Sequence, residues 1–228
     1  MDRKNEMFKL INEHSFLGDD LCTTHNIDFK NQSNFSNAVS NSLDELTPSL
    51  TLNVKKDLLW RFQICLWAAN KCKYVEGDFI ELGVWYGVLS RAMCEYVEFG
   101  KCNKKFYLVD SWGTDGSHSN YQDDIYDVVA RRFHKFGNVE LIRGLVPDVL
   151  GKIPSTKIAY LAIDMNGSKP ERAALEYFYD KVSPGGVIYF DDYGWGYPEL
   201  RKEVDDFFKD KPEILLHFPS GNSIIIKQ

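Results

Sequence analysis

Four short apolar segments of this sequence each end in carboxylates, and carboxylates in such positions can bind a cation or a polar ligand. These acids are Glu81, Asp110, Asp164 and the pair Asp191 and Asp192. Ligands of an open α/β sheet bind beyond the carboxyl ends of its strands, so we expect the acids to share one edge. Asp164 and the pair should lie on neighbouring strands, where three negative charges repel one another unless a cation or a proton intervenes.

A divalent cation with oxygen ligands is the economical explanation for these three aspartates. A small set of carboxylates completed by water molecules suits Mg²⁺. No cluster rich in histidine or cysteine competes for zinc. We therefore predict Asp164, Asp191 and Asp192 as metal ligands. The alternative is that they are solvated acids at strand ends and in a turn, with no metal.

Residues 77–87, Gly-Asp-Phe-Ile-Glu-Leu-Gly-Val-Trp-Tyr-Gly, indicate a cofactor pocket. A short apolar strand runs into a glycine turn, and a helix follows. Gly83 lets the backbone approach a ligand where a Cβ would collide. Glu81 does not suit a phosphate but does suit an ammonium group, and S-adenosylmethionine carries both an ammonium and a sulfonium. Because the turn after the strand has only two glycines, Gly83 and Gly87, the motif is also compatible with a strand-turn-helix that binds nothing.

Asp110, at the tip of the next strand, can accept hydrogen bonds from both hydroxyls of a ribose. An aspartate in this position can also be a turn or N-cap residue. We predict a cofactor site formed by Glu81, Gly83, Tyr86, Asp110, Ser111, Gly144 and Asp164.

The hydrophobic pattern predicts the elements that position these residues. Strands are expected at 79–82, 105–110, 139–143, 157–164, 187–190, 214–218 and 223–227, and helices at 53–72, 89–97, 125–136, 170–182 and from Pro198. Ser183-Pro-Gly-Gly186 should be a turn. Only four residues separate the last two strands, so they form a hairpin and the last strand is antiparallel. The fold class is therefore α/β: a seven-stranded, mostly parallel sheet.

Length and composition agree with one enzyme-sized domain. The 228 residues suggest an N-terminal arm or cap at 1–52 and a cofactor-binding domain at 53–228. The cap would cover a pocket or join two subunits of a homo-oligomer, whereas an arm would be mobile. A net charge of −6 disfavours nucleic-acid binding, and the absence of a long apolar run disfavours a membrane span. Five scattered cysteines without a CxxC pair suggest a reducing, cytoplasmic location.

The order of these motifs resembles the class I S-adenosylmethionine-dependent methyltransferases, whose fold is Rossmann-like with helices on both faces of the sheet. More closely, over about residues 75–228, the chain resembles the macrocin O-methyltransferase family. The segments that carry this resemblance are Leu-Val-Asp110-Ser, Ile-Asp164, Val-Ser-Pro-Gly-Gly186 and Phe-Asp191-Asp192-Tyr-Gly194. The resemblance implies metal-dependent methylation of a sugar hydroxyl, with magnesium on Asp164, Asp191 and Asp192.

The sequence departs from the family pattern after the fourth strand. The family often has Asp-Gly-Asp there, but this chain has Asp164-Met-Asn166. The related catechol enzymes place a lysine base three residues after the first metal aspartate, where this chain has Gly167. The sequence therefore leaves two candidates for the general base, Asp164 itself and His118. His118 lies in a polar loop at 111–125 that we expect to act as a lid.

Two other functions are compatible with the same pattern. A nicotinamide-dependent oxidoreductase would use a similar sheet, although the missing third glycine and Glu81 argue against it. A non-catalytic cofactor-binding partner would not need three clustered carboxylates. We favour an enzyme that transfers a methyl group to a hydroxyl of a sugar, nucleotide sugar, glycan or similar polar metabolite.

Overall fold

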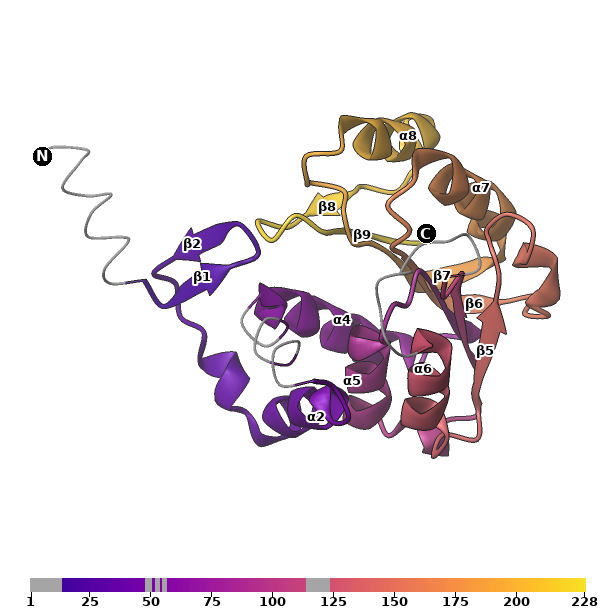
Figure 1. Cartoon of the computed structure of the whole chain (residues 1–228). Helices are drawn as coiled ribbons and strands as arrows, with labels where there is room; N and C mark the ends of the chain where they lie inside the picture. Colours follow the sequence, from indigo (N-terminus) through magenta and orange to yellow (C-terminus); the bar gives the residue numbers. More distant parts are fainter. Residues whose placement is uncertain (1–13, 48–50, 52–53, 55–56, 114–123) are drawn as a thin grey trace, which may run out of the picture.

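The computed structural model describes residues 14–47, 51, 54, 57–113 and 124–228, and a seven-stranded sheet forms its centre (Figure 1). The strand order is β5-β4-β3-β6-β7-β9-β8. Five consecutive strands, β5, β4, β3, β6 and β7, are parallel, and β9 runs antiparallel to both β7 and β8. The predicted sheet and its reversed last strand are confirmed. The strands are β3 (Asp78–Leu82), β4 (Phe106–Asp110), β5 (Val139–Arg143), β6 (Ile158–Ile163), β7 (Val182–Phe190), β8 (Leu216–His217) and β9 (Ser223–Ile226).

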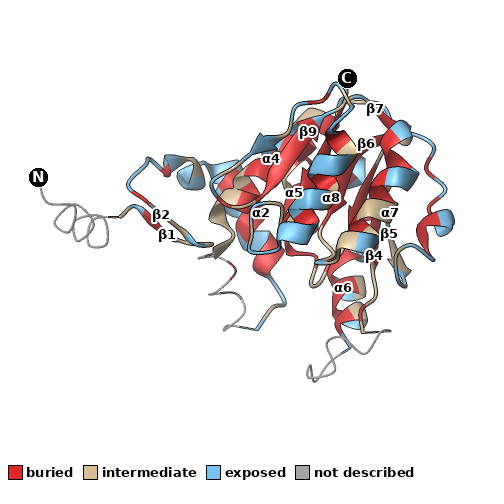
Figure 2. Ribbon diagram, turned by 90° about the horizontal axis from the view of Figure 1, so that it is seen from above, coloured by how far each residue is buried: buried red, intermediate tan, exposed pale blue. Residues whose placement is uncertain are grey.

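Helices cover both faces of the sheet, and the central strands are buried between them (Figure 2). Side chains of a strand alternate between the two faces, so Phe79 packs on one layer and Ile80 on the other. The first layer contains α2 (Ser33–Leu43), α4 (Leu59–Cys72), α5 (Val88–Tyr96) and α6 (Ile125–Phe133). The second contains α7 (Ser168–Phe178) and α8 (Pro198–Phe208). This is the predicted α/β architecture.

Two predicted boundaries need correction. Ser183-Pro-Gly-Gly186 is not a turn before a strand, because β7 already begins at Val182 and includes these residues. The pairing of β7 with β6 changes register within this stretch: Val182 lies opposite Ile158, and Val187 lies opposite Tyr160. The residues of β7 between these two pairs outnumber those of β6, so they form an irregularity inside the strand. The helix predicted at 53–72 is interrupted by a bend at Leu58: α4 begins at Leu59, and the described residues Val54 and Asp57 before the bend are also helical.

The described part of the N-terminal segment folds against the domain. A small hairpin comes first, made of β1 (Phe16–Gly18) and β2 (Leu21–Thr23), and a short 3₁₀ helix (Asp28–Asn31) follows it. Helix α2 then contributes Phe35, Ala38 and Leu43 to the same core cluster as α4 and α5.

Arg132 of α6 ties the end of α2 to the glycine turn after β3. Its side chain is almost fully buried, at 1% exposure. The guanidinium donates hydrogen bonds to the backbone carbonyls of Ser42, Asp44 and Tyr86. The buried guanidinium of Arg132 is held by carbonyl dipoles, and it provides hydrogen-bond donors to three backbone carbonyls that would otherwise lack partners.

Among the described residues, no helix combines the length and the apolar composition needed to cross a lipid bilayer.

Arg132→Met should lower the free energy of unfolding by about 3 kcal/mol or more, because hydrogen bonds to charged groups contribute roughly 1.5–3 kcal/mol each and three carbonyls lose their partner. Urea denaturation measures this change. Arg131→Met is the matched control, because Arg131 is exposed on the same helix, and it should change stability by less than about 0.5 kcal/mol. Equal effects of the two substitutions would show that the carbonyl contacts contribute nothing.

Candidate functional site

The predicted acids meet at the carboxyl edge of the sheet, around a cavity of about 650 Å³. Strands β3, β4, β6 and β7 are parallel and paired in register, so their ends bring Glu81, Asp110, Asp164 and Asp191 to one edge. This volume lies in the range of small-molecule sites. The predicted residues that line the cavity are Glu81, Gly83, Asp110, Ser111, Gly144, Asp164, Asp191 and Asp192.

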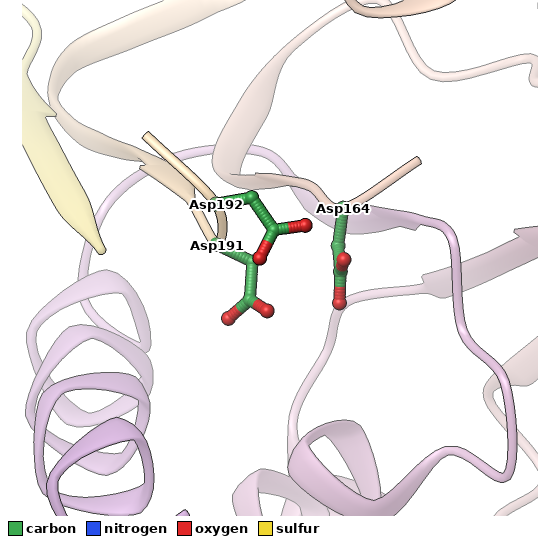
Figure 3. Close-up of side chains that lie close together, drawn as sticks. All are labelled: Asp164, Asp191 and Asp192. Carbon is green, nitrogen blue, oxygen red and sulfur yellow. The ribbon is translucent and has the colours of Figure 1, made fainter. Parts of the chain in front are cut away.

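Three of these carboxylates form a cluster that can hold a cation. One oxygen each from Asp164, Asp191 and Asp192 lies within 4.8 Å of the others. Figure 3 shows Asp164, which follows β6, on one side of a gap and the pair that follows β7 on the other. A set of hard oxygen donors fits Mg²⁺ or a similar divalent cation better than zinc or copper.

The electrostatics of the cluster show how strongly its charges interact. Burial first, and then the negative charges of Asp191 and Asp192, raise the pKa of Asp164 well above its usual range. Burial and the charge of Asp191 raise the pKa of Asp192 to about 6. Both carboxyls therefore hold protons more readily than a solvated aspartate, as expected where carboxyls are buried and like charges are crowded together.

A guanidinium that the sequence analysis missed lies against this cluster. Arg61 of α4 donates a hydrogen bond to the Asp191 carboxylate and lies 3.8 Å from an oxygen of Asp192. On its other side it donates to both oxygens of Asp19, at 2.8 and 2.9 Å. Burial alone would lower the pKa of Arg61, but these carboxylates outweigh it and hold the pKa well above its ordinary value. Nothing in the helical pattern distinguishes Arg61, because its partners are distant in sequence.

Asp191 is held in place by two further side chains. The Tyr189 hydroxyl donates to its second oxygen at 2.5 Å, and Asn222 donates to that hydroxyl at 2.9 Å. Both side chains are buried. The carboxylate thus has a fixed orientation toward the cavity edge, as expected for a metal ligand supported by its surroundings.

The glycine turn brings two strand ends into close contact. Gly83 has a φ of +85°, and a Cβ built on it would lie 1.6 Å from the backbone oxygen of Asp164. The Asp164 amide in turn donates to the carbonyl of Leu82 at 2.8 Å. Only glycine fits this position, so the turn that lines the cavity also sets the position of the first acid of the cluster.

Asp110 already has a structural role in the turn. One carboxylate oxygen accepts hydrogen bonds from the amides of Val84 and Trp85, and the other accepts from the amide of Trp112. A carboxylate has about four acceptor positions, so it retains capacity for a ligand hydroxyl. The ribose assignment stays a prediction, with the added expectation that replacing Asp110 also disturbs the loop.

Glu81 is the buried acid of the cavity. Its side chain is 5% exposed, and its Oε2 atom has no hydrogen-bond partner among the described residues. Burial, and to a smaller degree the charges of Asp191 and Asp110, raise the pKa of Glu81 to about 8. A buried carboxyl with one unpartnered oxygen, in a ligand-sized cavity, is suited to a cationic group that arrives with the ligand.

Two other predicted site residues, Tyr86 and His118, are not among the described residues that line the cavity. Tyr86 is not part of the cavity lining formed by the described residues, and its carbonyl accepts a hydrogen bond from Arg132. His118 and most of the loop predicted as a lid lie outside the described residues.

Comparisons with known proteins agree with this geometry. A model described as macrocin-O-methyltransferase matches residues 11–215 of the chain. The 8-demethyl-8-(2,3-dimethoxy-alpha-L-rhamnosyl)-tetracenomycin-C 4'-O-methyltransferase of Streptomyces olivaceus is 26% identical over 140 residues, which cover 52% of this chain and 54% of that protein. The chain thus spans about half the length of this curated relative.

Solved structures share the fold. The O-methyltransferase NovP superposes with a TM-score of 0.63 at 21% identity, covering 75% of this chain and 80% of that chain. The methyltransferase PaMTH1 of Podospora anserina, bound to S-adenosylhomocysteine (SAH), has a TM-score of 0.60 at 14% identity, with coverage of 86% and 88%. CalS11, described as a TDP-rhamnose 3'-O-methyltransferase, has a TM-score of 0.56 at 16% identity, with coverage of 89% and 96%.

The raised pKa of Glu81 generates a test of the cavity. If its carboxylate binds the ammonium of SAH, binding must release the Glu81 proton near pH 7. The affinity for SAH should therefore increase between pH 6 and 7.5, by up to roughly tenfold per pH unit. Calorimetry in buffers of different ionisation enthalpy measures the released proton.

Glu81→Gln should flatten this pH dependence, whereas Glu140→Gln, on the edge strand β5, should preserve it. An unchanged slope in Glu81→Gln would contradict the assignment.

Proposed function

Because the chain belongs to the macrocin-O-methyltransferase family, we propose that it transfers a methyl group from S-adenosylmethionine to a hydroxyl of a sugar, nucleotide sugar, glycan or similar polar metabolite. Because the chain belongs to this family, we drop the alternative function that the sequence had left open, a nicotinamide-dependent oxidoreductase. The observation that carries the proposal is the convergence of Asp164, Asp191 and Asp192 beside the cavity that contains Glu81.

The names of two similar proteins support a sugar as the methyl acceptor. The Streptomyces olivaceus protein is named for 4'-O-methylation of a rhamnosyl tetracenomycin, and CalS11 is described as acting on TDP-rhamnose. Both names describe a hydroxyl on a deoxysugar. We therefore propose a deoxysugar, attached to a nucleotide or to a larger product, as the first acceptor class to examine.

We assign the cofactor to the inner part of the cavity. Glu81 would accept the ammonium group, and the backbone at Gly83 leaves room for the cofactor chain. Asp110 and Ser111 would face the ribose, and Gly144 would allow close approach on the far side. S-adenosylmethionine, when bound, supplies the electrophilic methyl group. The contribution of the chain is to orient that group and the acceptor oxygen, which accounts for much of the rate in such transfers.

We assign a divalent cation, most simply Mg²⁺, to Asp164, Asp191 and Asp192. The donor set fits, because three carboxylate oxygens lie within 4.8 Å of one another and two of the carboxyls have raised pKa values. Bound there, the cation supplies Lewis acidity that lowers the pKa of an acceptor hydroxyl. The aspartates provide the negative charge that retains the cation.

Asp164 is our candidate for the proton acceptor. Its pKa is raised, and it lies between the glycine turn of the cofactor cavity and the other two acids. A carboxylate with a raised pKa is a stronger base than an ordinary aspartate. Asp164 would then serve both as a ligand of the cation and as the proton acceptor, because these two roles need not fall on separate residues. His118 remains the alternative base.

The experiment is transfer of a labelled methyl group from S-adenosylmethionine to nucleotide deoxysugars and deoxysugar glycosides, with and without chelator. We expect activity with Mg²⁺, loss in excess chelator and recovery on adding Mg²⁺. Asp191→Asn and Asp192→Asn should each lower Mg²⁺ affinity by about tenfold or more. Asp164→Asn should lower kcat by roughly 10²–10⁴-fold, beyond its effect on Mg²⁺ affinity.

Asp206→Asn, an exposed position of α8, is the matched control and should retain activity. Full activity in excess chelator would refute the metal assignment and make His118 the candidate base. No transfer to any acceptor, despite cofactor binding, would favour a non-catalytic binding module.

A further inference from the structure

Arg61 forms a bridge between the acid cluster and a distant segment of the chain. Its side chain is 6% exposed, and its ion-pair partners Asp19 and Asp191 are 4% and 9% exposed. The ring of Trp195 covers the guanidinium, with 5.3 Å between the Arg61 Cζ and the ring centroid. A bridge so enclosed is screened little by salt and fixes the geometry of both partners.

Asp19 lies at the tip of the N-terminal hairpin. It and Asp20 connect β1 to β2, and both have positive φ, at 52° and 53°. This is the backbone of a tight two-residue hairpin turn, a conformation that aspartate tolerates. The turn directs the Asp19 carboxylate to Arg61, where two parallel hydrogen bonds hold it. The tip of the hairpin is therefore attached to the acid cluster through one side chain.

The same guanidinium donates to the Asp191 carboxylate that would bind the cation. Arg61 Nη1 donates to Asp191 Oδ2 and is 3.8 Å from Asp192 Oδ1. A divalent cation among the three aspartates would face the positive charge of Arg61 at short range, and the two would compete for the same carboxylates. Asp19 lies on the opposite side of the guanidinium and holds it beside Asp191.

We propose that Arg61 is a positioning residue that serves as the built-in counter-ion of the acid cluster and docks the β1–β2 hairpin through Asp19, so that cation binding and hairpin docking oppose each other. This inference rests on the metal site proposed above. In the cation-free protein Arg61 has partners on both sides and the hairpin is held. A cation among the aspartates would repel the guanidinium from the position in which Asp19 holds it, and by linkage a docked hairpin that holds the guanidinium there weakens the cation site to the same degree.

The test is calorimetric titration of the full chain with Mg²⁺, without cofactor or acceptor, together with hydrogen exchange of residues 16–23. Arg61→Gln should bind Mg²⁺ about tenfold or more tightly than the wild type, because a repelling charge is gone. A merely structural role of Arg61 would not raise cation affinity. In the wild type, saturating Mg²⁺ should accelerate exchange of the hairpin amides, and in Arg61→Gln exchange should be fast with or without Mg²⁺.

Asp19→Asn separates the two roles of the bridge. The hairpin should exchange rapidly, but the guanidinium remains beside Asp191, so Mg²⁺ affinity should rise far less than in Arg61→Gln. Lys105→Gln removes a positive charge at the opposite edge of the sheet, from an exposed pair with Glu140, and should change neither readout. Circular dichroism verifies the fold of each variant. If Arg61→Gln does not fold, wild-type exchange with and without Mg²⁺, compared with Asp19→Asn, decides the question.

Weaker or unchanged Mg²⁺ binding in folded Arg61→Gln, or hairpin exchange in the wild type that ignores saturating Mg²⁺, would overturn the proposal. Failure of the metal site itself has a different signature. Neither the wild type nor Arg61→Gln would then bind Mg²⁺, while slow hairpin exchange in the wild type and fast exchange in Asp19→Asn would show that the docking contact stands without a coupled cation.

Discussion

The repulsion among three carboxylates at one edge of the sheet is the constraint on which the rest of this structure depends. Asp164, Asp191 and Asp192 are held within 4.8 Å of one another by the strands that precede them, and burial together with this crowding raises the pKa values of Asp164 and Asp192. A fold that keeps such a cluster must supply positive charge. The chain supplies one guanidinium from α4, and the geometry of the oxygens suits a divalent cation.

The parallel sheet produces this crowding and also makes it useful. Because β3, β4, β6 and β7 end at the same edge, the turn that lines the cofactor cavity and the acids of the cluster lie side by side. Gly83 brings the two strand ends into contact, and Asp110 orders the loop above them through three backbone amides. The residues that line the cavity and the acids of the cluster are thus neighbours at the carboxyl ends of the same strands. The methyl transfer that we propose would need such proximity between its donor and its acceptor.

Most of the sheet and the acid cluster were predictable because they depend on local patterns. Apolar runs identify buried strands, and an acid at the end of such a run lies at the carboxyl edge whatever the details of packing. Boundaries were less predictable: Ser183-Pro-Gly-Gly186 has the composition of a turn, but pairing with β6 extends β7 through it. Arg61 and Asp19 were not predictable, because the contacts of Arg61 with Asp19 and Asp191 span 42 and 130 positions and leave no periodic signal.

The most direct test of the central claim is a crystal structure of the chain grown with Mn²⁺ and S-adenosylhomocysteine, using the anomalous signal of manganese to locate the cation. We expect one anomalous peak bound by oxygens of Asp164, Asp191 and Asp192, with the ammonium of the ligand at Glu81. Well-ordered ligand in the cavity, with no anomalous peak among the three aspartates at saturating Mn²⁺, would contradict it.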